Sequence, residues 1–239
     1  MSSELPVWAV IPAAGSGSRM QQDKPKQYLE FQGKTIIEHC LDRLLCHPAI
    51  DGAVIVLQQD DRIWEGLDYH SNKTIFIADG GSERQHSVYS GLTTLQYRCG
   101  NDAIALVHDA VRPLVNHEDL GKVIAAARAH TAGAILAASL TDTLKLQNND
   151  MEIARTMPRE GLWRALTPQV FHLQVLLNAL RRVIDDDTAI TDDAQAVELS
   201  GYNPALVAGS TENFKITTPG DLALAEKIWL NQCNQQDDE

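Results

Sequence analysis

The chain has few basic side chains for its acidic content, with 20 Lys and Arg against 32 Asp and Glu among its 239 residues and a net charge of −12. Such a surface repels nucleic acids and anionic membranes, so we expect neither as a partner. If the ligand is an anion, the basic residues must gather locally against the overall field of the protein.

Cysteine and long apolar segments are also scarce. The four cysteines include no Cys-x-x-Cys pair and have no accompanying histidine cluster, which disfavours a zinc site or a disulfide framework. No apolar run approaches the roughly 18 residues of a membrane span. The first apolar stretch is short, lacks a basic leader and is interrupted by Pro12, unlike a signal peptide. We therefore expect a cytoplasmic protein.

The chain does contain short apolar runs that alternate with segments of helical periodicity. We expect strands at 7–11, 53–57, 74–78, 103–107 and 133–138. Helices are expected at 35–45, 87–97, 117–130 and 173–184. Strands without polar alternation, separated by helices, are typical of a mostly parallel sheet covered on both faces. No linker or repeat interrupts this pattern, so we predict one α/β domain over residues 1–239, a Rossmann-like three-layer sandwich.

Residues 139–160 depart from this pattern. Residues 141–146 alternate like an exposed strand, Asn148-Asn149-Asp150 favours a hairpin turn, and residues 153–157 fit a return strand. We predict a β-arm that leaves the sheet. Such an arm needs a surface to pack on, and a second subunit is the natural candidate.

The C-terminal part returns to short elements. Thr191 is expected to cap a helix that continues through Leu199, and short strands are expected at 206–208 and 214–216. Thr218, followed by Pro219 and then an aspartate at the third helical position, predicts the start of the last helix.

The first strand runs into the small residues of Pro12-Ala13-Ala14-Gly15-Ser16-Gly17-Ser18, which let backbone N–H groups come close to a ligand. Met20 stands where a dinucleotide fingerprint and a Walker A loop both need glycine, which excludes those loops and with them a dehydrogenase. Arg19 and Lys26 add two separated cations, so this segment is suited to hold a polyphosphate. The alternative is a plain turn between a strand and a helix.

Polar residues also follow two other predicted strands, in the segments 79–87 and 108–113. Right-handed crossovers bring the carboxyl ends of parallel strands to one edge of the sheet, where ligands bind in open sheets. In the first segment, Gly81, Ser82, Arg84 and Ser87 suggest a nucleoside pocket. The alternative is an ordinary helix start capped by Ser82.

Asp109 ends a buried strand, and a buried carboxylate requires a partner. One interpretation is an ion pair with Arg112, and the other is a ligand for Mg²⁺ beside a polyphosphate. We expect His108 to serve packing and not catalysis. Arg159, Thr167, Thr191 and Lys215 offer hydroxyls and cations for a second phosphorylated substrate, but their spacing does not show that they converge.

Several motifs in one order resemble those of the 2-C-methyl-D-erythritol 4-phosphate cytidylyltransferases, a nucleotidyltransferase family of the non-mevalonate isoprenoid pathway. Each motif alone is shared by many nucleotidyltransferases, whereas their order and spacing over nearly the whole chain are specific. The motifs are Pro12–Met20, Lys24–Tyr28, Asp79–Arg84, His108–Pro113, Asp142-Thr143, Leu162–Gln169, Ile190–Asp193 and Asn213–Thr217.

The resemblance implies a nucleotide-diphospho-sugar transferase-like fold and a homodimer whose β-arm crosses between subunits. It implies transfer of CMP from CTP to methylerythritol phosphate, with Mg²⁺ and release of pyrophosphate. The implied catalytic residues are Arg19, Lys26, Lys215 and Arg159, the last serving the neighbouring subunit. The implied CTP-binding residues are Pro12, Ala13, Ala14, Gly15, Gly17, Gly81, Ser82, Arg84, Ser87 and Ala110. The implied acceptor-binding residues are Asp109, Arg112, Thr143, Thr167 and Thr191, with Asp109 also a metal ligand.

Two alternatives remain open at this point. A ribitol-5-phosphate cytidylyltransferase would use the same chemistry on a different alcohol. A non-catalytic CTP-binding module would bind the nucleotide without turnover, although the presence of Arg19, Lys26 and Lys215 speaks against it. One departure from the family pattern is Ser82, where some relatives have aspartate, so contacts through that side chain differ while backbone contacts remain.

Overall fold

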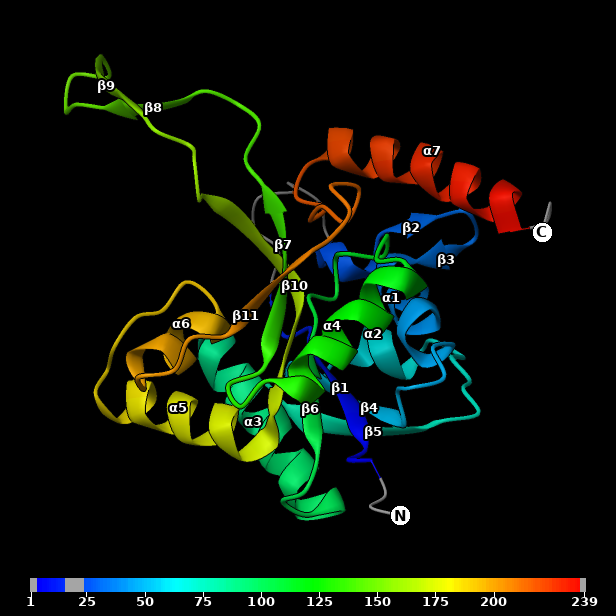
Figure 1. Cartoon of the computed structure of the whole chain (residues 1–239). Coiled ribbons are helices and arrows are strands. Elements are labelled where there is room, and N and C mark those ends of the chain that lie inside the picture. The colour runs from blue at the N-terminus through cyan, green and yellow to red at the C-terminus, as the bar shows by residue number, and fades with distance from the viewer. Residues whose placement is uncertain (1–3, 16–23, 237–239) are drawn as a thin grey trace.

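A computed structural model describes residues 4–15 and 24–236. Its centre is a seven-stranded sheet of order β11-β7-β10-β6-β1-β4-β5, seen in Figure 1. All neighbouring strands run parallel except β10, which is antiparallel to both β6 and β7. The strands are β1 (Val7–Pro12), β4 (Gly52–Leu57), β5 (Thr74–Asp79), β6 (Ile104–Val107), β7 (Ala134–Ser139), β10 (Trp163–His172) and β11 (Ala205–Ala208). The predicted mostly parallel sheet is confirmed.

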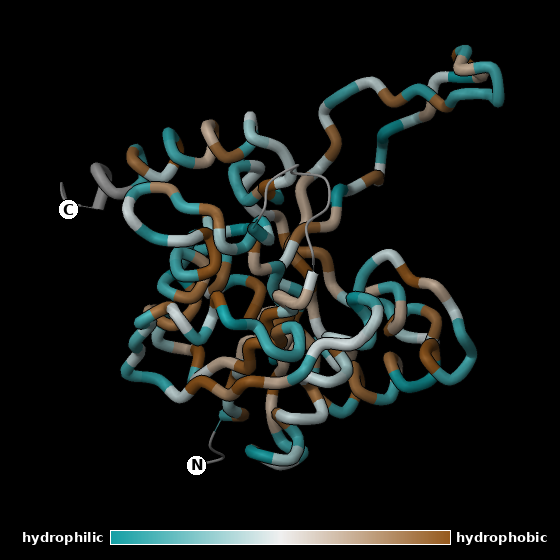
Figure 2. Tube along the Cα trace, turned by 180° about the vertical axis from the view of Figure 1, so that it is seen from behind, coloured by the Kyte–Doolittle hydropathy of each residue, from teal (hydrophilic) through white to brown (hydrophobic). Residues whose placement is uncertain are grey.

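Helices cover both faces of this sheet. Alternate strand residues point to opposite faces, so Ile11 packs in a core with α1 (Ile36–Leu45) and α4 (His117–Ala129). Its neighbour Val10 packs in a second core with α3 (Arg84–Cys99), α5 (Leu173–Asp185) and α6 (Asp193–Leu199). Figure 2 shows the hydrophobic residues concentrated along the central strands. The fold is the predicted three-layer α/β sandwich.

Smaller elements surround one end of this body. They are a 3₁₀ turn η2 (Lys26–Tyr28), the short strands β2 (Glu30–Phe31) and β3 (Lys34–Thr35), and the helix α2 (Arg62–Glu65). The last helix, α7 (Pro219–Gln236), packs through Ala225 on a third core that includes Phe31 and Leu114. The predicted start of this helix is confirmed, because Asp221 N–H donates to Thr218 Oγ1 at 3.2 Å.

The strand β10 has no counterpart among the strands predicted from the sequence. It contains Pro168, and proline in a central strand removes a ladder donor, which argues against a strand in pattern-based reasoning. The structure accommodates the proline with a register shift between Ala165 and Gln169, where the pairing with β7 is interrupted. This bulge lies at the carboxyl edge of β6, and Thr167 is part of it.

The predicted β-arm is present. The antiparallel strands β8 (Leu144–Gln147) and β9 (Ile153–Met157) pair with each other and project from the body in Figure 1. The arm carries the exposed side chains of Met151 and Ile153, which are 78% and 66% accessible.

Two local predictions are wrong. The N-cap of α6 is Asp192, which accepts from Gln195 N at 3.0 Å, whereas the Thr191 hydroxyl donates to the Gln195 side chain. Residues 214–216 form no strand, because only Ile216 N donates to a neighbouring segment, at Val111 O.

Among the described helices, none is both long and apolar enough to cross a bilayer.

Candidate active site

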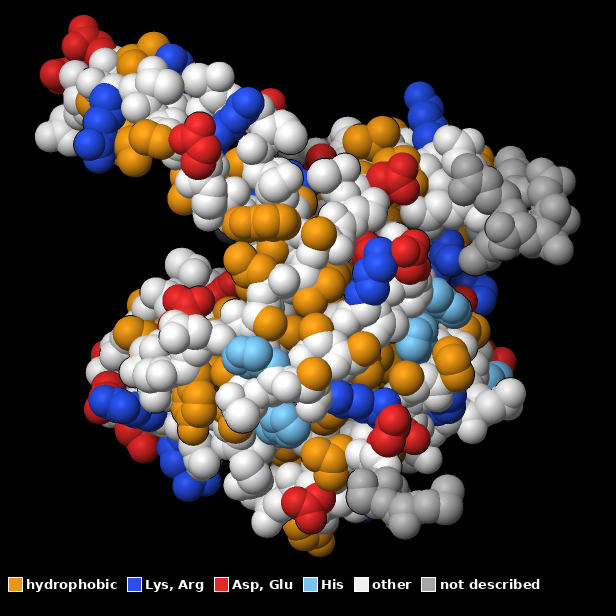
Figure 3. All heavy atoms as spheres, viewed as in Figure 1, with side chains coloured by type: hydrophobic (Ala, Val, Ile, Leu, Met, Phe, Trp, Pro, Cys, Tyr) orange, Lys and Arg blue, Asp and Glu red, His pale blue; other side chains and the backbone are white. Residues whose placement is uncertain are grey.

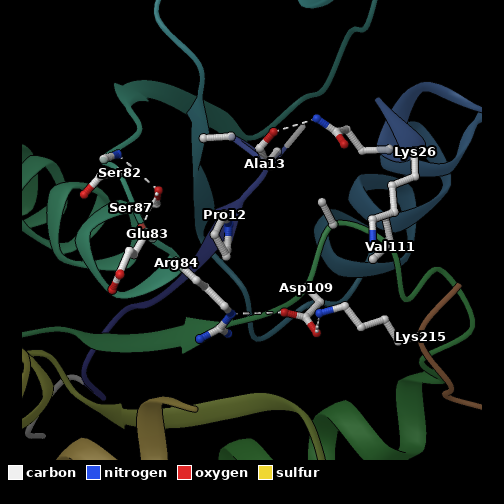
Figure 4. A pocket seen from close by; sticks show the side chains of 15 residues that line it. Pro12, Ala13, Lys26, Ser82, Glu83, Arg84, Ser87, Asp109, Val111 and Lys215 are labelled. Carbon is white, nitrogen blue, oxygen red and sulfur yellow. Dashed lines mark hydrogen bonds and ion pairs between the residues drawn. The ribbon is translucent and has the colours of Figure 1, made fainter. Parts of the chain in front are cut away.

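A pocket of about 230 Å³ opens where β1, β5 and β6 reach the carboxyl edge of the sheet, shown in Figure 4. The three predicted strand ends therefore converge, as the crossover rule requires. The lining residues are Pro12, Ala13, Ala14, Gly15, Lys26, Gln27, Gly81, Ser82, Glu83, Arg84, Ser87, Asp109, Ala110, Val111 and Lys215. Gly17 and Arg19, which the sequence also assigned to this site, lie outside the described residues.

The loop after β1 is anchored on both sides of Ala13. Ala13 N donates to Val56 O at 2.8 Å, which continues the pairing with β4 beyond the strand. Ala13 O accepts from the buried side chain of Gln27 at 2.6 Å. Gln27 belongs to the turn that also carries Lys26, so this hydrogen bond sets the turn against the small-residue loop. In the sequence, Gln27 stands within the Lys24–Tyr28 motif, and nothing there indicates that its side chain contacts Ala13 O.

The second wall of the pocket is the start of α3. At Gly80, a Cβ atom would lie 2.3 Å from the Cβ of Ala14, so only glycine lets the two loops meet this closely. Gly81 N donates to Ser87 Oγ at 3.1 Å, and that hydroxyl donates to Glu83 O at 3.2 Å. Ser87 therefore holds the loop in shape. The alternative of a cap by Ser82 is wrong, because Glu83 occupies the N-cap position and makes no side-chain cap.

Asp109 is the electrostatic centre of the site. Its Oδ2 lies 3.1 Å from Arg112 Nε and 3.1 Å from Lys215 Nζ, and its Oδ1 lies 3.4 Å from Arg84 Nε. Figure 4 shows Arg84 and Lys215 meeting this carboxylate from two sides. Burial alone would raise the pKa of Asp109, but Arg84, Lys215 and Arg112 outweigh it and hold the pKa below its ordinary value. The predicted pair with Arg112 is confirmed as one of three contacts.

Arg84 also contacts a second carboxylate. Its Nη2 lies 2.9 Å from Oδ2 of Asp193, a fully buried residue at the start of α6. Burial raises the pKa of Asp193 above its ordinary value in spite of the attraction of Arg84. The Arg84 side chain thus joins α3, the end of β6 and α6 through two buried acids.

A second pocket of about 260 Å³ adjoins the first and shares Arg84, Asp109 and Lys215 with it. Its remaining wall comes from Arg112 after β6, from the β10 bulge and from the loop before α6, and it includes three predicted acceptor residues. These lining residues are Arg112, Ala165, Leu166, Thr167, Gln169, Thr191 and Asp192. The structure therefore brings together Thr167, Thr191 and Lys215, whose sequence spacing could not show that they converge, whereas Arg159, the fourth residue of that set, is not among the lining residues.

Buried amides fix this second wall. Gln169 Nε2 donates to Asp192 Oδ2 at 2.8 Å, and Gln169 Oε1 accepts from Ala194 N at 2.9 Å. Asn213, two residues before Lys215 in the chain, donates from Nδ2 to Thr167 O at 2.7 Å. Neither Gln169 nor Asn213 was assigned a role from the sequence. Their signal was a polar amide within a motif, which does not distinguish a structural from a binding role.

His108 lies behind the second pocket and is fully buried. Burial lowers the pKa of His108 to about 4, and the hydrogen bond to the Arg112 carbonyl opposes this effect only in part. The ring is therefore neutral at pH 7. The expectation that His108 is not a catalytic acid or base agrees with this charge state.

Thr143 and Arg159 do not join the other predicted residues. Both are exposed on the arm segment, and Arg159 Nη1 donates to Thr141 O. Neither is among the residues that line the two pockets described above. Thr143 directly precedes β8 and Arg159 follows β9 by two residues, and these two strands project away from the body (Figure 1).

The fit of this site to Mg²⁺ rests on Asp109. Within residues 4–15 and 24–236, no group of three or more His, Cys, Asp or Glu side chains could hold a metal ion. Both oxygens of Asp109 contact basic groups, so the carboxylate can supply one ligand and not a cage. An oxygen-loving cation would have to take its remaining ligands from a bound polyphosphate and water.

Known proteins resemble this chain over nearly its whole length. The sequence matches the family model described as 2-C-methyl-D-erythritol 4-phosphate cytidylyltransferase over residues 7–231. It is 47% identical to the protein of that name from Vibrio atlanticus over 233 residues, which cover 97% of this chain and 99% of the relative. It is 43% identical to that from Pseudomonas putida over 234 residues, which cover 97% of this chain and 100% of the relative.

Solved structures agree with the sequence comparison. The Francisella tularensis 2-C-methyl-D-erythritol 4-phosphate cytidylyltransferase superposes with a TM-score of 0.80 at 32% identity, covering 93% of this chain and 99% of that one. The Thermus thermophilus protein of the same name gives a TM-score of 0.74 at 30% identity, covering 95% and 98% of the two chains. The family model, the curated relatives and the solved structures thus agree, and the chain belongs to the family of 2-C-methyl-D-erythritol 4-phosphate cytidylyltransferases.

Proposed function

We propose that the chain is a cytoplasmic enzyme that transfers CMP from CTP to 2-C-methyl-D-erythritol 4-phosphate in isoprenoid precursor biosynthesis. The products are 4-diphosphocytidyl-2-C-methyl-D-erythritol and pyrophosphate. The observation that carries the proposal is the contact between the two pockets. A loop of small residues lines the first, hydroxyls and Arg112 line the second, and Arg84, Asp109 and Lys215 belong to both.

The reaction requires two phosphorylated substrates to be aligned and the charge on their phosphates to be stabilised. An oxygen of the acceptor phosphate attacks the α-phosphorus of CTP in line, a P–O bond forms, and the bond to the bridging oxygen of the β-phosphate breaks. The acceptor phosphate is already ionised at neutral pH, so no general base is required. Lys26 lines the first pocket, and Lys215 lines both pockets. Both ammonium groups would stabilise the negative charge on the phosphates in the transition state. By similarity, Arg19 would act with them.

Mg²⁺ is part of the proposal. Asp109 would supply one carboxylate oxygen and the triphosphate would supply others, in keeping with the oxygen ligands this cation prefers. When bound, the ion neutralises part of the triphosphate charge. Arg84, Arg112 and Lys215 hold Asp109 ionised. The carboxylate can therefore coordinate a cation or accept a hydrogen bond from a hydroxyl of the substrate that receives CMP.

The test is pyrophosphate release by the purified chain with CTP, Mg²⁺ and either methylerythritol phosphate or ribitol 5-phosphate. We expect the higher kcat/KM with methylerythritol phosphate. Faster turnover of ribitol phosphate would favour the ribitol enzyme. CTP binding in calorimetry without turnover of either acceptor would favour the non-catalytic module.

We also propose a homodimer in which the arm reaches the neighbouring site. The arm and its root expose Met151, Ile153, Leu162 and Trp163, and Figure 3 shows hydrophobic groups on this projecting part. Burial of such side chains against a second copy would bring Thr143 and Arg159 to a pocket that their own chain does not reach.

Mixed dimers test this arrangement. Arg159→Ala and Lys26→Ala chains should each be inactive alone, whereas a dimer of one with the other contains one site with both residues intact. Random mixing should then restore about a quarter of the wild-type activity. No recovery in a mixture shown by mass spectrometry to contain mixed dimers would place Arg159 outside the partner's site.

A further inference from the structure

Lys26, which the proposed mechanism uses to stabilise charge, begins the turn η2 and lines the first pocket. A lysine carries its charge on a flexible four-carbon side chain, so the position of that charge depends on how firmly its backbone is held. The residues that follow it, Gln27, Tyr28 and Leu29, are all buried. Each of them is fixed to a different part of the molecule.

The first fixed point is the side chain of Gln27. Its Nε2 donates to Ala13 O at 2.6 Å, and Ala13 N donates to Val56 O at 2.8 Å. The Ala13 peptide therefore links the turn to the carboxyl ends of both β1 and β4. Burial of an amide costs free energy unless the amide is hydrogen-bonded, so this contact holds Gln27 in one place. Because Ala13 also lines the first pocket, the same bond sets Lys26 against the small-residue loop.

The second fixed point is the hydroxyl of Tyr28. Tyr28 Oη donates to Asp61 Oδ2 at 2.7 Å. The other carboxylate oxygen, Asp61 Oδ1, is the N-cap acceptor of α2 and accepts from Ile63 N and Trp64 N at 3.2 Å each. The cap fixes the orientation of this carboxylate, and the Tyr28 ring packs in the same core as α1. The hydroxyl therefore ties the turn to the segment that follows β4.

The third fixed point closes the turn on its C-terminal side. Leu29 O accepts from Ile36 N, at the start of α1, at 2.9 Å. The Leu29 side chain packs in the third core, which also contains Ile216, the neighbour of Lys215. The segments that carry Lys26 and Lys215 therefore share one packing support, although they come from opposite ends of the chain.

We propose that Gln27 and Tyr28 are positioning residues that hold the Lys26 ammonium group where charge develops on the phosphates. The inference rests on the proposed function, because it takes Lys26 to act in the transfer of CMP. A displacement of about 1 Å can lower a rate on the order of 10²-fold. Anchors on both β1 and β4 can therefore carry a catalytic effect without meeting the reacting atoms themselves.

A kinetic cycle of two variants tests the role of Gln27. Gln27→Met keeps the length of the side chain and removes the donor to Ala13 O. It should lower kcat about tenfold, less than the loss expected from removal of the Lys26 ammonium group itself. The KM for the substrate that receives CMP should change little, because among the described residues that line the second pocket none belongs to this turn. In a Lys26→Ala chain, Gln27→Met should lower kcat no further, since no ammonium group remains to be positioned.

Two outcomes of this cycle would overturn the positioning role of Gln27. One is a loss of kcat that keeps its size in the Lys26→Ala chain, which would show that Gln27 acts independently of Lys26. The other is a rise in the KM for CTP with kcat unchanged, which would show that Gln27 contributes binding alone.

Tyr28→Phe and Tyr69→Phe form a matched pair for the second anchor. Each change keeps the ring and removes one hydroxyl that is bonded to an aspartate, since Tyr69 Oη donates to Asp42 Oδ1 at 3.1 Å. Neither Tyr69 nor Asp42 is among the residues that line the two pockets. Both variants should lose similar stability in urea. Tyr28→Phe should also lower kcat severalfold, but not in a Lys26→Ala chain, whereas Tyr69→Phe should keep the wild-type kcat. Equal kcat in the two variants would overturn the role of Tyr28.

The outcomes stay separable if one variant fails. If Gln27→Met does not fold, Tyr28→Phe in the wild-type and Lys26→Ala chains still decides whether the turn positions Lys26. Failure of the proposed function would appear as no pyrophosphate release by the wild type with CTP and any polyol phosphate. Wild-type turnover with an undiminished kcat in both Gln27→Met and Tyr28→Phe would refute this inference alone.

Discussion

Removal of the Arg84 guanidinium should destabilise the fold far more than removal of the charge on Asp193. The two groups are 2.9 Å apart, Asp193 is fully buried, and Arg84 also contacts Asp109. In Arg84→Ala, the Asp193 charge stays buried without this partner, which costs about 3–5 kcal/mol. In Asp193→Asn, the buried charge disappears and Arg84 retains its ion pair with Asp109. The free energy of unfolding should therefore fall by only about 1 kcal/mol.

The effect of Arg84→Ala should depend on pH. Burial already raises the pKa of Asp193, and loss of Arg84 removes the main group that opposes this shift. A carboxyl with a raised pKa in the folded state binds more protons when folded, so the fold gains stability as pH falls. The deficit of the variant should be full at neutral pH. It should shrink as pH falls toward about 3.9, the value of an unperturbed Asp.

Urea unfolding at several pH values measures these differences, with the double variant Arg84→Ala/Asp193→Asn as the control. The double variant should be more stable than Arg84→Ala alone, because it no longer buries a charge without a partner. If Asp193→Asn costs as much as Arg84→Ala, or the double variant recovers nothing, the pair has a different energetic role from the one argued above.

Three further outcomes follow from the site and its supports. Lys26→Ala should lower kcat by on the order of 10²-fold or more in steady-state assays, as expected for a lost charge-stabilising donor. An unchanged kcat in the folded variant would remove Lys26 from the mechanism. Gly91→Ala should destabilise the chain by about 1–3 kcal/mol in urea. The reason is that the new Cβ would lie 2.7 Å from Val10 Cγ1 and 2.8 Å from Val56 Cγ2. A more stable variant would show that helix propensity outweighs this crowding. Backbone and side-chain hydrogen bonds outweigh burial and lower the pKa of Asp221. Asp221→Asn should therefore reduce the melting temperature at pH 7, and the reduction should disappear as pH falls through the lowered pKa. A reduction of the same size at all pH values would contradict this account.

The strands and helices that the sequence predicts are those in which burial and local pattern agree. Apolar runs without alternation identified β1, β4 and β6, because both faces of these strands are buried. They also identified the edge strand β5, although most of its residues remain partly exposed. The strand β10 escaped prediction because Pro168 conflicts with a central strand and only the bulge resolves the conflict. Likewise, the residue type at position 191 predicted Thr191 as the N-cap of α6, whereas in the folded loop Asp192 takes that position.

The candidate site shows the same division. Pro12, Gly81 and Asp109 could be placed together from the sequence, because they follow parallel strands. Gln27 and Asp193 could not, since a glutamine or aspartate in a motif has no pattern that reveals a buried partner. Their partners are Ala13 and Arg84, and only the folded chain brings these groups into contact.

The sequence by itself thus determined the architecture, the family and the edge of the sheet where the site lies. These follow from periodicity, motif order and the fixed handedness of strand crossovers, which are properties of local segments. Only the tertiary structure decided how the charges around Asp109 are compensated and that Thr167 Oγ1 meets Asp109 N–H and His108 Nδ1. Both depend on contacts between segments 58 to 106 positions apart in sequence, at Thr167 and Lys215 relative to Asp109. Hydrogen bonds and charge compensation depend on distances of a few ångströms, and no one-dimensional pattern encodes those distances.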